Sequence, residues 1–270
     1  MMLMIKPGDI LQNKDLQRIF RCGLQGGMRR SHRTNSLILV SDHTRGIYKD
    51  RWEGNILYYT GMGLKGDQSI SFSQNKTLAQ SKANNVTIQL FEVFNAGAYI
   101  YQGRVKLDST PIQETQLDIN NNNRKVWIFP SKLIDQAGPA PILEKDFQKV
   151  RMARENNVKK LSEEELRKRI KSTGNKASRR QVIGNKYDSS EEIKELAKRK
   201  AKGKCVLCNN DAPFKDKFGK PFLEGHHIIS LANGGPDTEE NVVALCPNCH
   251  RKMHILDLKS DKELLRQLFK

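Results

Sequence analysis

Metal-binding residue types are concentrated near the C-terminus of this chain. Four cysteines form two CxxC pairs, and four histidines lie among them: Cys205, Cys208, Cys246, Cys249, His226, His227, His250 and His254. A CxxC turn brings two sulfurs to one ion, and tetrahedral zinc takes four such ligands. Within the segment CPNCHRKMH, two cysteines and two histidines could therefore share one zinc or belong to two different sites.

The spacing of these residues separates the two possibilities. A finger with two cysteines and two histidines needs roughly a dozen residues between its CxxC pair and its first histidine. His250 directly follows Cys249, so that arrangement fails. We therefore expect both CxxC pairs to share one structural Zn²⁺, since paired cysteines in a reducing compartment favour zinc over disulfides. The remaining histidines are too many in one short segment to be explained as core packing.

The order of the histidines and one asparagine matches a known pattern. The segment FLEGHHIISLANGGPDTEENVVALCPNCHRKMH resembles the HNH, or ββα-metal, nucleases, which share this HH, Asn, His, His frame. With the flanking CxxC pairs it is similar to the C-terminal domain of McrA-type modification-dependent restriction enzymes. The resemblance implies two antiparallel strands and a helix, and a catalytic divalent metal bound by His226, His250 and His254.

The same resemblance implies the remaining roles. His227 acts as general base, because a neutral imidazole titrates close to working pH, and Asn241 holds the loop and orients it. The metal neutralises charge that develops on the scissile phosphate. Histidine-rich sites accept Mg²⁺, Mn²⁺, Co²⁺ or Ni²⁺, with Mg²⁺ or Mn²⁺ expected here. Arg251 is either a phosphate clamp or an exposed helix residue.

The elements that position these residues belong to a basic chain of 270 residues, which is long enough for two domains. Its net charge of +17 favours a polyanionic partner, of which nucleic acid is the commonest, although a merely basic protein is the alternative. We see no apolar run that could cross a bilayer and no signal peptide. We therefore expect a cytoplasmic, bacterial protein.

Three regions differ in texture. Residues 1–135 predict a β-rich domain, because short β-branched and aromatic runs alternate with Gly, Asn and Asp clusters; the runs are NSLILVSD, ILYYTGMG, VTIQLFEVF, AYIYQGRV and KVWIFP. Residues 136–187 predict a charged helical linker, with Ser162 and Glu165 as a capping box. That segment is either a solvated connection or a basic arm along DNA. Residues 188–270 carry the metal-binding residues.

The first region has a family likeness of its own. GGMRRSHRTNSLILVSD, followed by YTGMGLKGDQSISFSQNKTLAQS, resembles SRA domains in its YTG-G-G element and its later N-x-x-L-x-x-S stretch. SRA domains flip a modified cytosine into a pocket of a curved β-sheet. With Arg251 of the nuclease region included, the expected DNA- and base-binding residues are Met28, Arg29, Arg30, Ser31, Arg33, Tyr59, Thr60, Gly61, Asp67 and Arg251.

Several of these assignments have open alternatives. Arg29, Arg30 and Arg33 either contact phosphates or belong to a solvated basic loop. Adjacent strand residues face opposite sides of a sheet, so only one of Tyr58 and Tyr59 can face the pocket. We expect Tyr59 to stack on the base, with ordinary strand packing as the alternative. Asp67 is either a reader of the base edge or a turn-capping residue.

Together the expectations describe an α+β protein with an SRA/PUA-like barrel, a helical linker and a ββα-metal HNH domain with a four-cysteine zinc site. The predicted function is a modification-dependent (type IV) DNA endonuclease that reads 5-methylcytosine or 5-hydroxymethylcytosine in duplex DNA. One HNH site cuts one strand, so a double-strand break needs a homodimer or two encounters. The alternatives are an HNH nuclease with a modification-independent PUA-like DNA- or RNA-binding domain, and a non-catalytic, zinc-stabilised DNA-binding protein.

Overall fold

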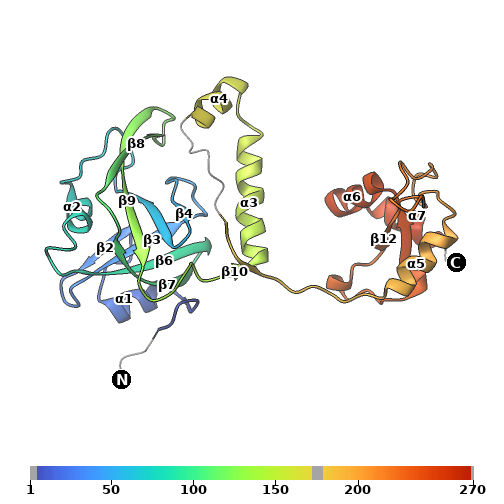
Figure 1. The fold of residues 1–270 in the computed structure, drawn as a ribbon, viewed down its shortest axis with the longest axis horizontal. Coiled ribbons are helices and arrows are strands. Elements are labelled where there is room, and N and C mark those ends of the chain that lie inside the picture. Colours follow the sequence, from blue (N-terminus) through green and yellow to red (C-terminus); the bar gives the residue numbers. More distant parts are fainter. Residues whose placement is uncertain (1–4, 172–178, 269–270) are drawn as a thin grey trace. The chain divides into compact units, whose positions relative to one another are not determined.

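The computed structural model describes residues 5–171 and 179–268 and divides the chain into two compact units, Met1–Gly184 and Asn185–Lys270 (Figure 1). Each unit has its own hydrophobic core, and we describe the two separately. Most of the segment predicted as a linker, residues 136–187, is grouped with the first unit. Among the described residues, no helix combines the length and the apolar character needed to cross a membrane.

A nine-stranded sheet is the frame of the first unit. The strand order is β2-β3-β6-β7-β9-β5-β4, with β1 paired to β7 and β8 paired to β9. Only the β3–β6 pair is parallel among the described pairs of this sheet. The strands are β1 (Ile10–Leu11), β2 (Met28–Ser31), β3 (Ser36–Asp42), β4 (Arg51–Glu53), β5 (Ile56–Thr60), β6 (Thr87–Asn95), β7 (Ala98–Leu107), β8 (Ile112–Leu117) and β9 (Asn123–Leu133).

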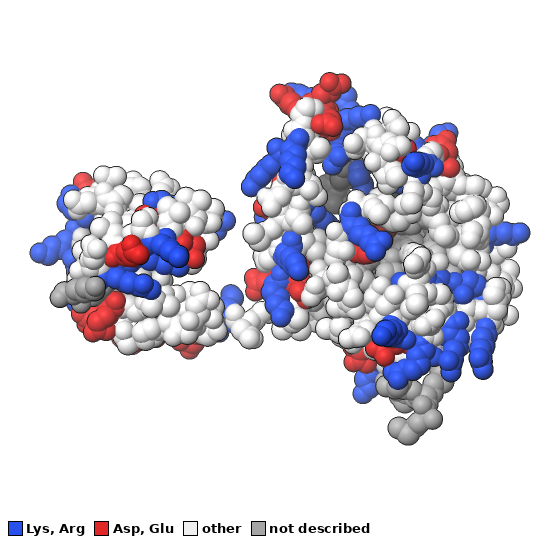
Figure 2. All heavy atoms as spheres, turned by 180° about the vertical axis from the view of Figure 1, so that it is seen from behind, with Lys and Arg blue, Asp and Glu red and all other residues white. Residues whose placement is uncertain are grey.

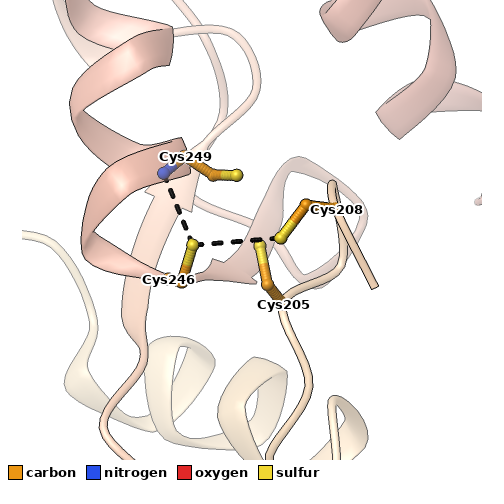
Figure 3. Close-up of side chains that lie close together, drawn as sticks. All are labelled: Cys205, Cys208, Cys246 and Cys249. Atoms are coloured by element: carbon orange, nitrogen blue, oxygen red, sulfur yellow. Dashed lines mark hydrogen bonds between the residues drawn. The ribbon is translucent and has the colours of Figure 1, made fainter. Parts of the chain in front are cut away.

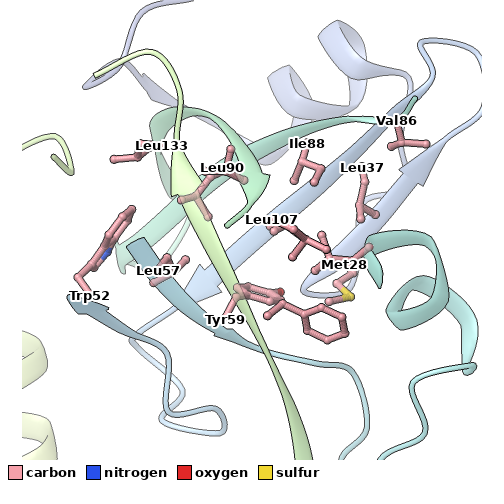
Figure 4. Close-up of a cluster of buried hydrophobic side chains, with 14 residues drawn as sticks. Met28, Leu37, Trp52, Leu57, Tyr59, Val86, Ile88, Leu90, Leu107 and Leu133 are labelled. Carbon is pink, nitrogen blue, oxygen red and sulfur yellow. The ribbon is translucent and has the colours of Figure 1, made fainter. Parts of the chain in front are cut away.

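The five runs predicted as strands are all strands, so the prediction of a β-rich first region is confirmed. Strand β3 shows why, because it is apolar on both faces. Leu37 and Leu39 pack into one core cluster (Figure 4), whereas Ile38 and Val40 pack on the opposite side. The side chains of a strand alternate between its faces, so β3 lies inside the structure rather than at a solvated surface.

Helices cover this sheet. Helix α1 (Asn13–Phe20) buries Leu16 and Phe20 against the Ile38 face, and α2 (Ser73–Ala79) buries Asn75 and Leu78. In the N-x-x-L-x-x-S stretch, Asn75 accepts a hydrogen bond from Met62 N at 2.7 Å and donates one to Met62 O at 3.1 Å. The stretch therefore fixes the glycine-rich loop after β5.

The charged segment after the sheet is anchored to it. Helix α3 (Glu144–Val158) runs alongside the sheet (Figure 1) and buries Val150 against Phe94 and Ile100. The short strands β10 (Ile142–Leu143) and β11 (Val182–Ile183) then pair in parallel. Helix α4 (Glu163–Lys171) buries no residue, and its predicted capping box is confirmed, since Glu165 N donates to the Ser162 hydroxyl at 3.2 Å.

A buried ionic network explains this anchoring. The carboxylate of Glu92, on β6, is fully buried and lies 2.8 Å from His43 Nε2, 3.0 Å from Trp52 Nε1 and 2.6 Å from Arg180 Nη2. Arg154 of α3 reaches His43 Nδ1 at 3.3 Å. Burial alone would raise the pKa of Glu92, but the hydrogen bond from His43 and the charge of Arg180 outweigh it and lower the pKa.

The second unit is small and has the predicted ββα order. Strand β12 (Glu224–His227) pairs antiparallel with β13 (Val242–Leu245), and helix α6 (Pro247–Leu256) follows directly. Helix α5 (Glu191–Lys200) precedes them and is capped by the Ser190 hydroxyl, while α7 (Lys259–Gln267) follows. Buried apolar residues of β13 and α6 pack around the cysteines to form the core of this unit.

Candidate active site and DNA-binding surface

The four paired cysteines converge on one point, which confirms that the two CxxC pairs form one cluster (Figure 3). Their sulfur atoms all lie within 4.8 Å of one another. Cys208 Sγ and Cys246 Sγ are 4.0 Å apart, and Cys249 N donates to Cys246 Sγ at 3.5 Å. Cys246 is thereby the N-cap of α6, so the first turn of that helix is part of the cluster.

The acidities of these thiols fit a cation site. Burial acts to raise the pKa of Cys205, but backbone N–H groups, including those of Cys208 and Leu207, stabilise its thiolate and lower the pKa to about 7. Burial raises the pKa of Cys246, and burial together with the neighbouring thiols raises that of Cys249. The cluster resists carrying several negative charges by itself, whereas a divalent cation between the sulfurs would stabilise them. The four-thiol donor set is the one that zinc prefers.

Three histidines form a second cluster that directly adjoins the first. Nitrogen atoms of His226, His250 and His254 lie within 4.8 Å of one another, and the Nε2 atoms of His250 and His254 are 3.2 Å apart. Residues four apart on a helix share a face, which is why α6 presents both of its histidines to β12. Burial, followed by the neighbouring His250 and His254, lowers the pKa of His226 to about 4. Its imidazole is therefore neutral at neutral pH and can bind a metal.

A carboxylate orients one of these imidazoles. Glu224 Oε2, at the start of β12, lies 2.7 Å from His250 Nδ1. With Nδ1–H donated to this carboxylate, His250 Nε2 keeps its lone pair for the cluster. A carboxylate behind a metal-binding histidine fixes the tautomer and makes the nitrogen more basic. The donor set and its outer partner therefore fit a divalent metal.

His227 is separate from the three-histidine cluster, because adjacent residues on β12 face opposite sides. His227 Nε2 lies 2.8 Å from Asp237 Oδ1, and Asp237 Oδ2 accepts a hydrogen bond of 2.7 Å from Ser190 N. The hydrogen bond from His227 and then that from Ser190 lower the pKa of Asp237. The ionised carboxylate accepts a hydrogen bond from Nε2–H of His227, which leaves the Nδ1 lone pair free to accept a proton.

The loop that carries Asp237 is closed by Asn241. The buried Asn241 side chain accepts from Ile229 N at 2.9 Å and donates to Pro236 O at 2.7 Å. Gly235 is needed here, since an added Cβ would lie 2.1 Å from Ile229 O. Asn241 thus ties together the two ends of the loop that carries Asp237, the hydrogen-bond partner of His227. Arg251 is exposed on α6, next in sequence to His250.

In the first unit, several residues expected at DNA lie inside the protein. Met28 is 4% exposed and belongs to the core, and Arg29 is 5% exposed, with Nη1 donating to Asn13 Oδ1 at 2.6 Å. Neither side chain lies at the surface of the unit, because α1 covers Arg29 and Met28 lies in the sheet interior. The Tyr59 ring is 3% exposed in the core of Figure 4, and its hydroxyl donates to Gly27 O at 2.8 Å. Strand packing, the alternative for Tyr59, is what the structure shows.

The other candidates divide between turn contacts and the surface. Arg30 Nη1 donates to Ser36 O at 3.0 Å and braces the turn between β2 and β3, whereas Asp67 Oδ1 accepts from Lys125 N at 2.7 Å and ties the loop after β5 to β9. Ser31 is buried, and Gly61 has no room for a side chain, since a Cβ would lie 2.8 Å from Asn75 Oδ1. Arg33 is exposed and lines a hollow of about 460 Å³ together with Gln17, Arg18, Arg21 and Cys22.

A polar group beside Thr60 was not predicted from the sequence. Asp50 Oδ1 accepts a hydrogen bond of 2.8 Å from Thr60 N, and the Thr60 hydroxyl is buried beside the same carboxylate. Burial raises the pKa of Asp50 although Thr60 N, the Ser41 hydroxyl and His43 lower it. An acidic residue in the segment YKDRW, just before the YTG element, was the available signal.

Lys and Arg side chains spread over much of the visible face of this unit (Figure 2).

Comparisons with known proteins match both units. The family model of the ScoMcrA-like SRA domain matches residues 7–142, half of the chain, and the HNH endonuclease model matches residues 205–255. The chain belongs to the ScoMcrA-like SRA family. It also carries an HNH domain, so the resemblance to an SRA domain fused to an HNH module is confirmed.

Two curated relatives are similar to parts of the chain. The type IV methyl-directed restriction enzyme EcoKMcrA of Escherichia coli (strain K12) is 47% identical over 77 residues, which are 28% of this chain and 27% of that protein. Anaredoxin of Nostoc sp. is 46% identical over 37 residues, 14% of this chain and 49% of that protein. The chain thus spans about a quarter of the first relative and about half of the second.

Solved structures give distant likenesses to this SRA–HNH chain. The phosphorothioation-dependent restriction endonuclease ScoMcrA is 17% identical with a TM-score of 0.41, covering 98% of this chain and 63% of that one. The modification-dependent TagI restriction endonuclease is 18% identical with a TM-score of 0.39, covering 94% and 79%. Scores this low carry no functional argument, so function has to be argued from the site.

Proposed function

We propose that this chain is a modification-dependent DNA endonuclease, in which the SRA domain reads a modified base and the HNH domain hydrolyses a phosphodiester bond. The observation that carries the proposal is the pairing of His227 with Asp237 next to the three-histidine cluster. One cluster can hold a divalent metal, and the pair beside it can take a proton. Phosphodiester hydrolysis needs both.

The residues of the HNH domain have distinct roles in this proposal. His226, His250 and His254 would hold a catalytic Mg²⁺ or Mn²⁺, with Co²⁺ or Ni²⁺ as alternatives, and this ion would neutralise charge on the phosphate. His227 Nδ1 takes the proton from the attacking water while Asp237 holds the ring in the required tautomer. Arg251 is positioned in sequence to contact a phosphate. The four cysteines hold structural Zn²⁺ and fix the start of α6.

For the SRA domain we propose a base pocket next to Asp50 and Thr60. A carboxylate oxygen accepts from the exocyclic amine of cytosine, which makes the half-buried Asp50 suited to reading that base. The Thr60 hydroxyl, buried beside Asp50, supplies a second polar contact. Because Tyr59 is enclosed, its stacking on a base would require a rearrangement of the pocket. The matched curated relative is described as methyl-directed, which favours 5-methylcytosine or 5-hydroxymethylcytosine in duplex DNA over other modifications.

Double-strand cleavage requires either two copies of the HNH site or two encounters, and we propose a homodimer on DNA. A panel of otherwise identical duplexes tests the whole proposal: cytosine, 5-methylcytosine, 5-hydroxymethylcytosine and a phosphorothioate linkage, each with Mg²⁺ or Mn²⁺. We expect cleavage of a modified duplex by the wild-type chain and none by His227→Ala. Equal cleavage of all duplexes would mean that the first domain binds DNA independently of modification. If no duplex is cleaved, the chain is better explained as a non-catalytic, zinc-stabilised DNA-binding protein.

A further inference from the structure

A basic aromatic hairpin projects from the HNH domain between the first CxxC pair and β12. Its sequence, FKDKFGKPF, spans residues 214–222 and alternates aromatic and lysine residues. The Phe214 and Phe222 rings stack with centroids 4.7 Å apart and planes 17° apart, and a β-bridge joins Lys215 to Pro221. We call residues 214–222 the Phe218 hairpin. The paired base makes it an ordered projection from the domain.

The tip of the Phe218 hairpin is held in one shape by its own backbone. Asp216 Oδ1 accepts hydrogen bonds from Phe218 N at 2.8 Å and Lys220 N at 3.0 Å, and Gly219 takes a left-handed φ of +78° that suits glycine. The Asp216 carboxylate is therefore occupied within the turn. A rigid turn that presents a side chain loses little conformational entropy when that side chain binds a partner.

The side chain presented at the tip is strongly apolar. Phe218 is 75% exposed, more than any other large hydrophobic side chain among residues 5–171 and 179–268. Lys217 Nζ lies 5.0 Å from the centre of the Phe218 ring, and Lys215 and Lys220 are exposed on the same hairpin. An exposed aromatic ring flanked by cations fits a partner that combines flat apolar surfaces with negative charge. Base pairs and phosphates are that combination.

The Phe218 hairpin also leads directly into the candidate active site. Phe222 is followed by Leu223 and then by Glu224, whose carboxylate contacts His250 at 2.7 Å. Two residues of extended chain span about 7 Å. The base of the hairpin therefore lies next to the three-histidine cluster, where the scissile phosphate would bind.

We infer that the Phe218 hairpin is a DNA-contacting element of the HNH domain, in which Phe218 wedges against a base step beside the cut and the lysines contact flanking phosphates. The inference builds on the proposed function, because that function places duplex DNA at the histidine cluster. Apolar side chains that partly unstack a base step bend the duplex and widen access to its backbone. The hairpin would thus help present the scissile phosphate to His227.

Site-specific cross-linking tests the contact without requiring cleavage. A benzophenone amino acid replaces Phe218 in the full chain carrying His227→Ala, and the matched control replaces Leu264, which is 48% exposed on α7. Irradiation with a modified duplex should give a protein–DNA adduct from position 218 and none above background from position 264. An adduct only with a second copy of the chain, or no DNA adduct, would overturn the inference.

The wedge itself is tested by cleavage kinetics after the wild-type cut position has been mapped. Phe218→Ala should lower kcat/KM on a fully paired duplex by about tenfold to a hundredfold, whereas Phe218→Trp and Leu264→Ala should stay near wild type. A mismatch at the contacted step removes most of the unstacking cost, so Phe218→Ala should cut that duplex nearly normally. Equal loss on both duplexes would refute the wedge, while a wild-type chain that cuts neither refutes the proposed function instead.

Discussion

Replacing Asp237 by asparagine should separate the orientation of the general base from everything else in the HNH domain. The introduced amide can still accept the hydrogen bond from Ser190 N through its oxygen. The amide nitrogen, however, must then donate toward His227 Nε2, which forces the imidazole proton onto Nδ1. The lone pair needed to accept a proton from water is lost, although the metal ligands are untouched.

The size of the effect follows from the contact that is broken. His227 Nε2 lies 2.8 Å from Asp237 Oδ1, so the bond is between a ring N–H and an ionised acceptor. Hydrogen bonds to charged groups contribute about 1.5–3 kcal/mol, which corresponds to roughly a 10- to 150-fold loss of rate. The wrong tautomer adds to this, and in the Ser-His-Asp triad the equivalent change costs about 10⁴-fold. We expect a loss of at least tenfold in kcat.

Single-turnover cleavage of a modified duplex measures this loss, with zinc content and DNA affinity measured on the same samples. Ser190→Ala is the matched control, because it removes the cap on Ile193 N at 3.2 Å and leaves the Asp237 contacts in place. That cap contributes about 1 kcal/mol to helix stability, so the control should cut at nearly the wild-type rate. If Asp237→Asn and Ser190→Ala lose activity equally, or if Asp237→Asn loses zinc, the orienting role is refuted.

Three further outcomes follow from the structure. Cys205→Ser or Cys246→Ser should release zinc and unfold the second unit while the first unit stays folded, which metal analysis and limited proteolysis would reveal. His226→Ala should keep its zinc. Loss of zinc from His226→Ala would mean that the two clusters are not separate. Because the folded-state pKa of Glu92 is lowered from 4.5, its stabilisation is present above about pH 4.5 and is lost as pH falls through the folded pKa. Glu92→Gln should flatten that acid dependence in calorimetry and cost about 3–5 kcal/mol by leaving Arg180 unpaired, and an unchanged acid profile would contradict this. Asp50→Asn should reduce the preference for a modified over an unmodified duplex by about tenfold in competition binding, whereas equal weakening for both duplexes would make Asp50 a scaffold residue.

The sequence predicted the metal clusters because their ligands are set by local spacing. Cys246 and Cys249 lie in one turn, and His250 and His254 lie on one helix face, so little tertiary information was needed. The sequence did not predict the role of Asp237, because its contact with His227 depends on how the loop closed by Asn241 folds back.

In the first unit, too, the burial of the candidate residues depends on tertiary packing. An arginine beside a glycine-rich loop looks like a phosphate contact, and only the position of α1 shows that Arg29 is enclosed by Asn13. Alternation along β5 predicted that Tyr58 and Tyr59 face opposite sides but could not say which side is filled by core. The pairing of Glu92 with Arg180 joins distant parts of the sequence, and no local sequence pattern predicts it.

The pairing of Glu92 with Arg180 has a consequence for how SRA domains can be exchanged between proteins. The family match ends at residue 142, yet the carboxylate in the middle of β6 finds its counter-ion at Arg180, and His43 is reached by Arg154. A domain cut at residue 142 would keep the contacts of this buried acid with His43 and Trp52 but would lose its arginine counter-ion, Arg180. Recombination that moves the reader intact must therefore also move α3 and the segment through β11, so the heritable module is longer than the recognisable one.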